Sequence, residues 1–397
     1  MSDDSNEKWR QATILVRGGL ERSPHCETSE ALFLNSGYVY GSAEEAEESF
    51  DGTRERFVYS RFRNPTVAMF ENRLALLEGA EACRATASGM AAVHAAILSQ
   101  VRAGDRVVAS RALFGSCRWI IDDLLRRYGI EVTFVDGTDL NQWKTALARP
   151  VRCVFIETPS NPTLEIIDIP AVAELTHAAG GTLIVDNVFA TPLLQKPLQL
   201  GADIVVYSAT KHIDGQGRCL GGAILSRQAF LTDVLGPYLR HTGPCLSPFN
   251  AWLLLKGLET LDLRVTRHVE NAERIATFLE GHPGIERVFH PSLASHPQYD
   301  LARRQMTGGG SIVAFTPKGG KEGAYRLLNA LRLIDISNNL GDAKSLITHP
   351  WTTTHQSRPA EEKLGMGITE GILRLSVGLE DARDLMDDLD NALRLHT

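Results

Sequence analysis

Between residues 65 and 225 the sequence alternates short apolar runs with helical segments, and this alternation constrains the fold more than any other feature. Six such runs recur along the chain, namely RVVAS, IEVTFV, VRCVFIE, TLIVD, DIVVYS and GGAIL. Segments with apolar residues at helical spacing, such as IPAVAELTHAAG, lie between several of them. Nearly continuous apolar strands that alternate with helices are typical of a mainly parallel sheet covered by helices on both faces. The sequence therefore predicts an α/β fold.

The pattern changes near residue 250, which indicates a second structural unit. Residues 251–281 read as one long helix, followed by the apolar run GSIVAFTP, a helix near 321–333, the run GILRLSVGL and a final helix. We expect a smaller α+β domain over 251–397, docked by the long helix, and a larger α/β domain over 61–250. Residues 1–60 are polar and irregular, so we expect this segment to pack against a neighbouring subunit.

Composition excludes several classes of function. The net charge is −7 and no Lys/Arg-rich run is present, so neither nucleic-acid binding nor a polybasic membrane contact is predicted. No apolar stretch reaches the roughly 18 residues that span a bilayer, and the start MSDDSNEKWRQ is unlike a signal peptide. The six cysteines are scattered without a C-x-x-C pair, which favours reduced thiols and a cytoplasmic location.

A single lysine, Lys211, follows the apolar run DIVVYS and precedes the glycine-rich stretch DGQGRCLGG. Ser208 and Thr210 place hydroxyl groups beside it. Asp186 ends another apolar run, TLIVD. Because ligands bind at the carboxyl ends of strands in open α/β sheets, we expect an amine and a carboxylate in one crevice.

Other residues supply groups that bind anions. The segment SGMAAVHAAILSQV predicts a helix over residues 88–101, and the free N–H groups of its first turn would attract an anion. Arg61 and Arg374 carry guanidinium groups suited to phosphate or carboxylate. An amine, a carboxylate, a phosphate cradle and an arginine together are what pyridoxal phosphate and an amino-acid substrate require.

Three alternative interpretations of the sequence are possible. Residues 208–211 match S-x-x-K, the nucleophile motif of serine β-lactamases, but the accompanying S-D-N and K-T-G motifs are absent from the sequence. His349 and His355 lie close together without a carboxylate or cysteine at the usual spacing, so no metal site is predicted. A binding protein without catalytic activity is the third alternative, if the groups around Lys211 are incidental.

Seven motifs, in the same order, resemble the Cys/Met-metabolism family of pyridoxal-phosphate enzymes, and they span nearly the whole chain. They are YSRFRNPT, ASGMAA, ETPSNPT, VDNVFATP, SATKHIDGQG, NNLGDAKSLITHP and LRLSVGLED. The family includes cystathionine γ-synthase, the γ-lyases and the O-acylhomoserine sulfhydrylases. The resemblance implies pyridoxal 5′-phosphate as cofactor, bound by residues 61–250. It also implies fold type I of the PLP-dependent transferases, the aspartate aminotransferase-like fold.

The resemblance assigns the cofactor site. Lys211 would form the Schiff base and move protons, and Asp186 would pair with the pyridine nitrogen. Asn161 would approach the ring hydroxyl, and Phe114 would stack on the ring. The phosphate would be held by Ser88, Gly89, Met90, Ser208 and Thr210.

The resemblance also implies a shared site and a substrate clamp. Tyr59 and Arg61 would reach the phosphate of the neighbouring subunit, which implies a homotetramer built from dimers with shared active sites. Arg374 would bind the substrate α-carboxylate, and Asn339 would lie near that carboxylate.

Three departures from the lyases bear on the reaction. Phe114 stands where the lyases have a tyrosine, Ser116 where methionine γ-lyases have a reactive cysteine, and Asn339 where many relatives have a serine. All three weigh against a degradative lyase, because phenylalanine stacks on a ring but exchanges no proton.

The resemblance then implies a reaction of methionine biosynthesis. We expect the γ-replacement of O-succinyl-L-homoserine by sulfide, which gives L-homocysteine and succinate. One alternative is cysteine as the nucleophile, as in cystathionine γ-synthase, and a less favoured one is γ-elimination. The choice between a succinyl and an acetyl leaving group stays open.

Overall fold

The computed structural model describes residues 9–394. The α-helices are α1 Gln11–Arg17, α2 Ala43–Asp51, α3 Pro65–Glu78, α4 Gly89–Leu98, α5 Gly115–Trp119, α6 Leu125–Arg127, α7 Leu140–Ala146, α8 Ile169–Ala178, α9 Thr191–Leu194, α10 Gly236–Thr242, α11 Pro248–Glu259, α12 Leu261–Glu280, α13 Tyr299–Gln305, α14 Gly320–Ala330, α15 Ala360–Gly365 and α16 Ala382–Arg394. The strands are β1 Ala82–Thr86, β2 Arg106–Ser110, β3 Glu131–Val135, β4 Cys153–Glu157, β5 Thr182–Asp186, β6 Ile204–Ser208, β7 Gly222–Ser226, β8 Ile285–Phe289, β9 Ile312–Pro317, β10 Asp335–Ile336, β11 Leu346–Thr348 and β12 Leu373–Ser376. Three shorter helical turns are η2 Ile120–Leu124, η3 Pro197–Leu200 and η4 Phe230–Leu235.

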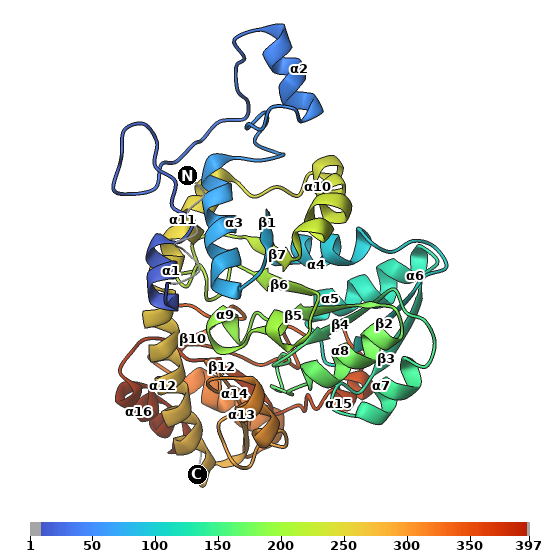
Figure 1. The fold of residues 1–397 in the computed structure, drawn as a ribbon. Coiled ribbons are helices and arrows are strands. Elements are labelled where there is room, and N and C mark those ends of the chain that lie inside the picture. Colours follow the sequence, from blue (N-terminus) through green and yellow to red (C-terminus); the bar gives the residue numbers. More distant parts are fainter. Residues whose placement is uncertain (1–8, 395–397) are drawn as a thin grey trace.

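The centre of the molecule is a seven-stranded sheet in the order β1-β7-β6-β5-β4-β2-β3 (Figure 1). Strands β6, β5, β4, β2 and β3 run parallel, whereas β7 is antiparallel to both of its neighbours. The predicted mainly parallel α/β sheet is therefore confirmed. Strand β1, with the sequence ACRAT, was not among the six predicted runs, because its small residues lack the β-branched signature.

Both faces of this sheet are buried, as the unbroken apolar strands predicted. Side chains alternate between the faces. Val107 and Phe155 pack with α4 and α5 on one face, whereas Val108 and Val154 pack with α7 and α8 on the other. Such two-sided cover leaves the carboxyl ends of the parallel strands as the accessible edge for a ligand.

Helix α3 illustrates how local sequence sets an element's bounds. The side chain of Asn64 accepts hydrogen bonds from the backbone N–H groups of Thr66 and Val67, and Pro65 occupies the first turn. Gly79 ends the helix with a φ of +82°, a left-handed conformation that glycine adopts without strain.

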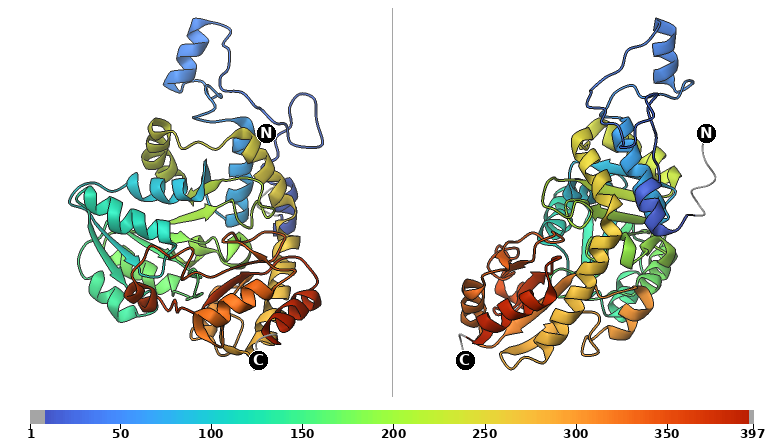
Figure 2. Two further views of the ribbon diagram at one scale, coloured as in Figure 1. Left: turned by 180° about the vertical axis from the view of Figure 1, so that it is seen from behind. Right: turned by 90° about the vertical axis from the view of Figure 1, so that its left-hand side faces the viewer.

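A second, five-stranded sheet has the order β10-β11-β12-β9-β8 and is mainly antiparallel. It packs one face against α12, α14 and α16 (Figure 2). Leu373 and Leu375 of β12 are buried in that helix-side core. Because side chains alternate along a strand, Arg374 lies on the opposite face, toward the first sheet.

The single helix predicted over 251–281 is wrong, because the structure divides it into α11 and α12 at Thr260, whose ψ of 7° departs from helical values. Tertiary contacts explain the break. Gly257 abuts the carbonyl oxygen of Ile213, which a Cβ atom would approach to 2.3 Å. Arg264 then donates to the carbonyl oxygens of His212, at 2.6 Å, and Gly257, at 2.7 Å. These bonds tie the helix junction to the loop that carries Lys211.

The N-terminal segment is not wholly irregular. Helix α1 packs against α3 and buries Leu15, whereas α2 projects away from the body of the molecule (Figures 1 and 2). Val39 lies just before α2, in the projecting part of the chain that we call the N-terminal arm, and is 89% exposed. The division of the chain at residues 60 and 250 stays a prediction. Within residues 9–394, no helix combines the length and apolarity that crossing a bilayer demands.

Candidate active site

A cavity of about 270 Å³ opens at the carboxyl edge of the seven-stranded sheet. Its walls come from the ends of β4, β5 and β6, from the first turn of α4, and from loops that connect the strands of the smaller sheet. The predicted site residues that line it are Ser88, Gly89, Met90, Phe114, Asn161, Asp186, Ser208, Thr210, Lys211 and Arg374.

The amine of Lys211 reaches a residue in the loop between β10 and β11 of the smaller sheet. Its Nζ donates a hydrogen bond to Oδ1 of Asn339 at 2.6 Å. Burial, and to a lesser degree the charge of Arg374, lower the pKa of Lys211 to about 8. The amine is therefore far closer to its neutral, nucleophilic form at physiological pH than an exposed lysine is.

Asp186 ends strand β5 and is only 8% exposed. Its Oδ1 accepts a hydrogen bond from the backbone N–H of Val188 at 3.1 Å. Burial raises the pKa of Asp186 to about 7, since little solvent stabilises the carboxylate. A cation in the cavity, such as a protonated ring nitrogen, would stabilise the ionised form.

The first turn of α4 abuts the end of β6 and forms an anion cradle. Ser88 caps this ten-residue helix, with its Oγ accepting from the N–H of Ala91 at 3.1 Å. A Cβ atom at Gly89 would lie 2.6 Å from the Cβ of Ser208, so only glycine permits this approach. Thr210 is held by Gly221, whose N–H donates to its Oγ1 at 3.1 Å. The cradle combines hydroxyl groups with the positive end of a helix dipole.

Arg374 is 2% exposed and enters the cavity from β12. Its Nη1 donates to Oδ1 of Asn161 at 3.1 Å, and its Nη2 donates to the carbonyl oxygens of Asn338 and Asn339 at 2.8 and 3.2 Å. Burial lowers the pKa of Arg374 to about 10, and Glu157 partly opposes this. A guanidinium held in this way remains charged at neutral pH.

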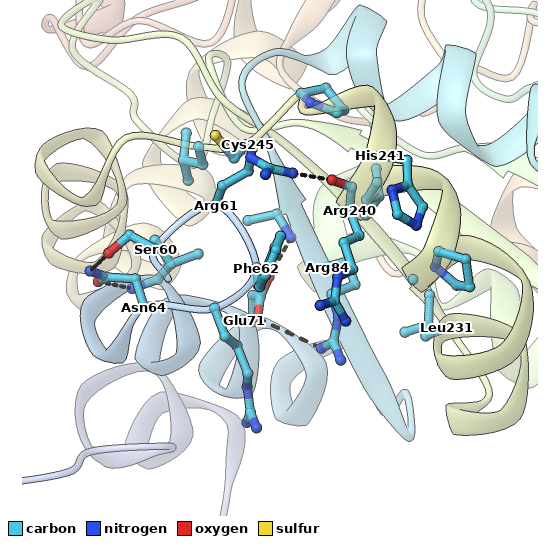
Figure 3. Close-up of a pocket in the computed structure, with 18 of the residues that line it drawn as sticks. Ser60, Arg61, Phe62, Asn64, Glu71, Arg84, Leu231, Arg240, His241 and Cys245 are labelled. Atoms are coloured by element: carbon cyan, nitrogen blue, oxygen red, sulfur yellow. Dashed lines mark hydrogen bonds and ion pairs between the residues drawn. The ribbon is translucent and has the colours of Figure 1, made fainter. Parts of the chain in front are cut away.

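Tyr59 and Arg61 do not lie in this cavity. Arg61 lines a second cavity of about 470 Å³ together with Arg84, Arg240 and His241 (Figure 3). Its guanidinium donates to the carbonyl oxygen of Arg240 and lies 4.8 Å from the centre of the Phe62 ring. The sequence prediction assigned both residues to a neighbouring subunit's site, which a single chain leaves untested.

The sequence prediction missed several residues of the site. Glu157, Asn338 and Thr354 also line the cavity. Glu157 carried a signal that could have found it, because it ends an apolar strand as Asp186 does. Asn338 opens the motif NNLGDAKSLITHP, which could have drawn attention to it, whereas Thr354 lies in a connection without a periodic pattern.

The expected cofactor fits the groups present. The cradle of α4 and β6 offers donors to a phosphate, and Asp186 offers a buried carboxylate to a ring nitrogen. The Nε of Arg374 is buried and has no hydrogen-bond partner among the residues that the structure describes. This unused donor, on a charged group facing the cavity, suits a substrate carboxylate.

A site with this donor set, at the carboxyl edge of a mainly parallel sheet, defines an enzyme that handles amino acids on pyridoxal phosphate. The sequence model of the Cys/Met metabolism PLP-dependent enzymes matches residues 12–394, and the chain belongs to this family. The family prediction is therefore confirmed, and with it the dependence on pyridoxal 5′-phosphate and the α/β fold of its members.

Individual relatives cover almost the whole chain. The chain is 57% identical over 387 residues to an O-succinylhomoserine sulfhydrylase of Mycobacterium tuberculosis, across 96% of this chain and 95% of the relative. It is 48% identical over 381 residues to that of Pseudomonas aeruginosa, across 96% and 94%. A crystal structure of cystathionine gamma synthase from Xanthomonas oryzae pv. oryzae, in complex with aminoacrylate and cysteine, superposes with a TM-score of 0.93 at 35% identity, covering 97% of this chain and 98% of that one.

Proposed function

We propose that the protein catalyses the γ-replacement of O-succinyl-L-homoserine by sulfide, which yields L-homocysteine and succinate. The observation that carries the proposal is the convergence of Lys211 and Arg374, from two different sheets, on one cavity. The two sulfhydrylase relatives support this reaction, since identity to them is 57% and 48%, compared with 35% to the synthase structure.

The roles of the residues follow from their contacts. Arg374 would bind the α-carboxylate of the substrate, and Lys211 would hold the cofactor through its amine. Bound pyridoxal phosphate supplies an electron sink for the charge left on the substrate Cα. The Nζ of Lys211, once neutral and free, takes the Cα proton and then a Cβ proton, and returns them after sulfide has replaced succinate at Cγ. Asn339 keeps Nζ near this path through its hydrogen bond.

The remaining residues hold the cofactor in this proposal. Asp186 would face the ring nitrogen and favour its protonated form, and Asn161 would approach the ring hydroxyl. The phosphate would be held by residues that line the cavity, namely Ser88, Gly89, Met90, Ser208 and Thr210. Phe114 would stack on the ring but exchange no proton. Succinate needs less acid assistance to depart than a thiolate does, so the missing phenol favours an acylhomoserine over a thioether substrate.

The nucleophile decides between the proposal and its nearest alternative. Purified protein with O-succinylhomoserine is expected to form homocysteine from sulfide faster than cystathionine from cysteine. Faster formation of cystathionine would instead identify a cystathionine γ-synthase. Release of 2-oxobutyrate from methionine at a comparable rate, without added nucleophile, would identify a γ-lyase. O-acetylhomoserine in parallel assays decides the leaving group.

The lowered pKa of Lys211 predicts how cofactor capture depends on pH. The neutral amine becomes dominant as the pH rises through about 8, instead of through the ordinary value of 10.5. Cofactor-free protein mixed with pyridoxal phosphate is therefore expected to gain its visible absorption band at a rate that is half-maximal near pH 8. In the Arg374→Ala variant the midpoint should move upward, because a neighbouring cation is lost. A wild-type midpoint above pH 10 contradicts this environment for Lys211.

The assembly and location are further parts of the proposal. The exposed N-terminal arm, whose Gly37 forms a backbone bridge with Tyr59, supports a homotetramer built from dimers in which Tyr59 and Arg61 serve the neighbouring site. Sedimentation analysis measures the mass of the assembly directly. All six cysteines are free thiols, which supports the cytoplasm as location.

A further inference from the structure

Glu157 is a buried carboxylate of the cavity to which the proposed roles assign nothing. It ends strand β4 and pairs in register with Asp186 at the end of β5. Residues in register on neighbouring strands point to the same face of a sheet. With exposures of 4% and 8%, the two carboxylates therefore lie side by side at the edge where the cofactor ring is expected.

Each oxygen of Glu157 accepts a hydrogen bond from the backbone of a different loop. Oε2 accepts from the N–H of Phe114 at 2.7 Å, and Oε1 accepts from the N–H of Asn161 at 2.9 Å. Phe114 precedes helix α5, and Asn161 lies between β4 and α8. One side chain thus joins the segment expected to stack on the ring to the segment expected to approach the ring hydroxyl.

The second of these segments continues to the substrate clamp. Oδ1 of Asn161 accepts from Nη1 of Arg374, and Nη2 of the same guanidinium is fixed by two carbonyl oxygens. The residue whose backbone N–H Glu157 holds is therefore the residue whose side chain reaches Arg374. A displacement at Glu157 would therefore be transmitted to the guanidinium, over two hydrogen bonds.

The two hydrogen bonds to Glu157 require two acceptor oxygens, but they do not require the carboxyl group to be ionised. Burial, followed by the neighbouring Asp186, raises the pKa of Glu157 well above its ordinary value, whereas Arg374 lowers it. Both oxygens retain an acceptor lone pair whether the group is ionised or protonated. An amide at this position has only one acceptor, and its NH₂ group would face a backbone N–H.

We propose that Glu157 is a positioning residue that fixes Phe114 against the cofactor ring and, through Asn161, orients Arg374 for the substrate. The cofactor part of this inference rests on membership of the family, and the Arg374 part rests on the proposed function.

The test compares Glu157→Gln with a matched control, Glu165→Gln, in the purified holoenzyme. Glu165 lies eight residues further along the same connection; burial raises its pKa to about 7, and its Oε2 has no hydrogen-bond partner among residues 9–394. Visible circular dichroism of the bound cofactor reports how the ring is held, and steady-state kinetics separate KM from kcat. For Glu157→Gln we expect a weaker dichroic band at unchanged absorbance and a KM for O-succinylhomoserine that is about 10-fold higher. Glu165→Gln should match the wild type in both.

Glu157→Asp keeps both acceptor oxygens on a shorter side chain, so its dichroic band should lie between those of the wild type and Glu157→Gln. If Glu157→Gln does not fold, the band of Glu157→Asp is compared with that of the wild type instead. A wild-type band and KM in Glu157→Gln would overturn the proposal. So would equal losses in the two amide variants, because those would reflect general destabilisation. Wild-type protein that carries the band but performs no γ-replacement contradicts the proposed function alone, since the dichroism of the variants still decides whether Glu157 positions the ring.

Discussion

Replacement of Lys211 with alanine is expected to lower kcat for γ-replacement by about 10³-fold or more and to remove the visible absorption band. In the proposed mechanism the side chain provides both the covalent attachment of the cofactor and the base that moves the substrate protons, and positioned bases alone contribute about 10² to 10⁴-fold. No other lysine lines the cavity among the described residues, so no neighbour can substitute for it. Absorbance and a homocysteine assay on the purified variant measure both effects.

Lys196→Ala is the matched control for this experiment. Lys196 is also a largely buried lysine whose pKa burial lowers, but it donates to the carbonyl oxygen of Leu77, outside the cavity. Its removal should leave the band and the rate close to those of the wild type. A band that survives in Lys211→Ala would place the cofactor on a different amine and would require a new assignment of the site.

Replacement of Arg374 with alanine is expected to lower kcat/KM for O-succinylhomoserine by about 10²-fold, mostly through KM. The guanidinium is buried and hydrogen-bonded, and truncating one partner of a buried charge pair costs about 2–5 kcal/mol. The visible band should persist, because within residues 9–394 the hydrogen bonds of this side chain go to Asn161, Asn338 and Asn339 and not to the residues of the cradle. Arg374→Lys keeps the charge but loses the planar fork, so we expect an intermediate KM. An unchanged KM in Arg374→Ala would mean that another group binds the α-carboxylate.

The sequence predicted the strand-end residues well, and the reason is physical. Lys211 and Asp186 each follow a continuous apolar run, and parallel strands end at one edge of a sheet, so their meeting was predictable without coordinates. The anion cradle was predictable for the same reason, since Ser88 and Gly89 open a helix that begins at that edge.

Features that depend on contacts distant in sequence could not be predicted from local patterns. The break at Thr260 lies between two tertiary contacts, of Gly257 with Ile213 and of Arg264 with His212, which no periodicity in the helix signals. The run GGAIL indicated a strand but not its antiparallel direction. The hydrogen bond from Lys211 to Asn339 requires the placement of one sheet on the other. Where Tyr59 and Arg61 act depends on a second chain.

Lys211 follows β6 of the first sheet and Arg374 lies on β12 of the second, and the chain passes from one sheet to the other through helices α11 and α12. The separation of Lys211 and Arg374 is therefore set by how the two sheets pack on each other. The hydrogen bonds from Arg264 of α12 to the carbonyl oxygens of His212 and Ile213, next to Lys211, help to fix that separation.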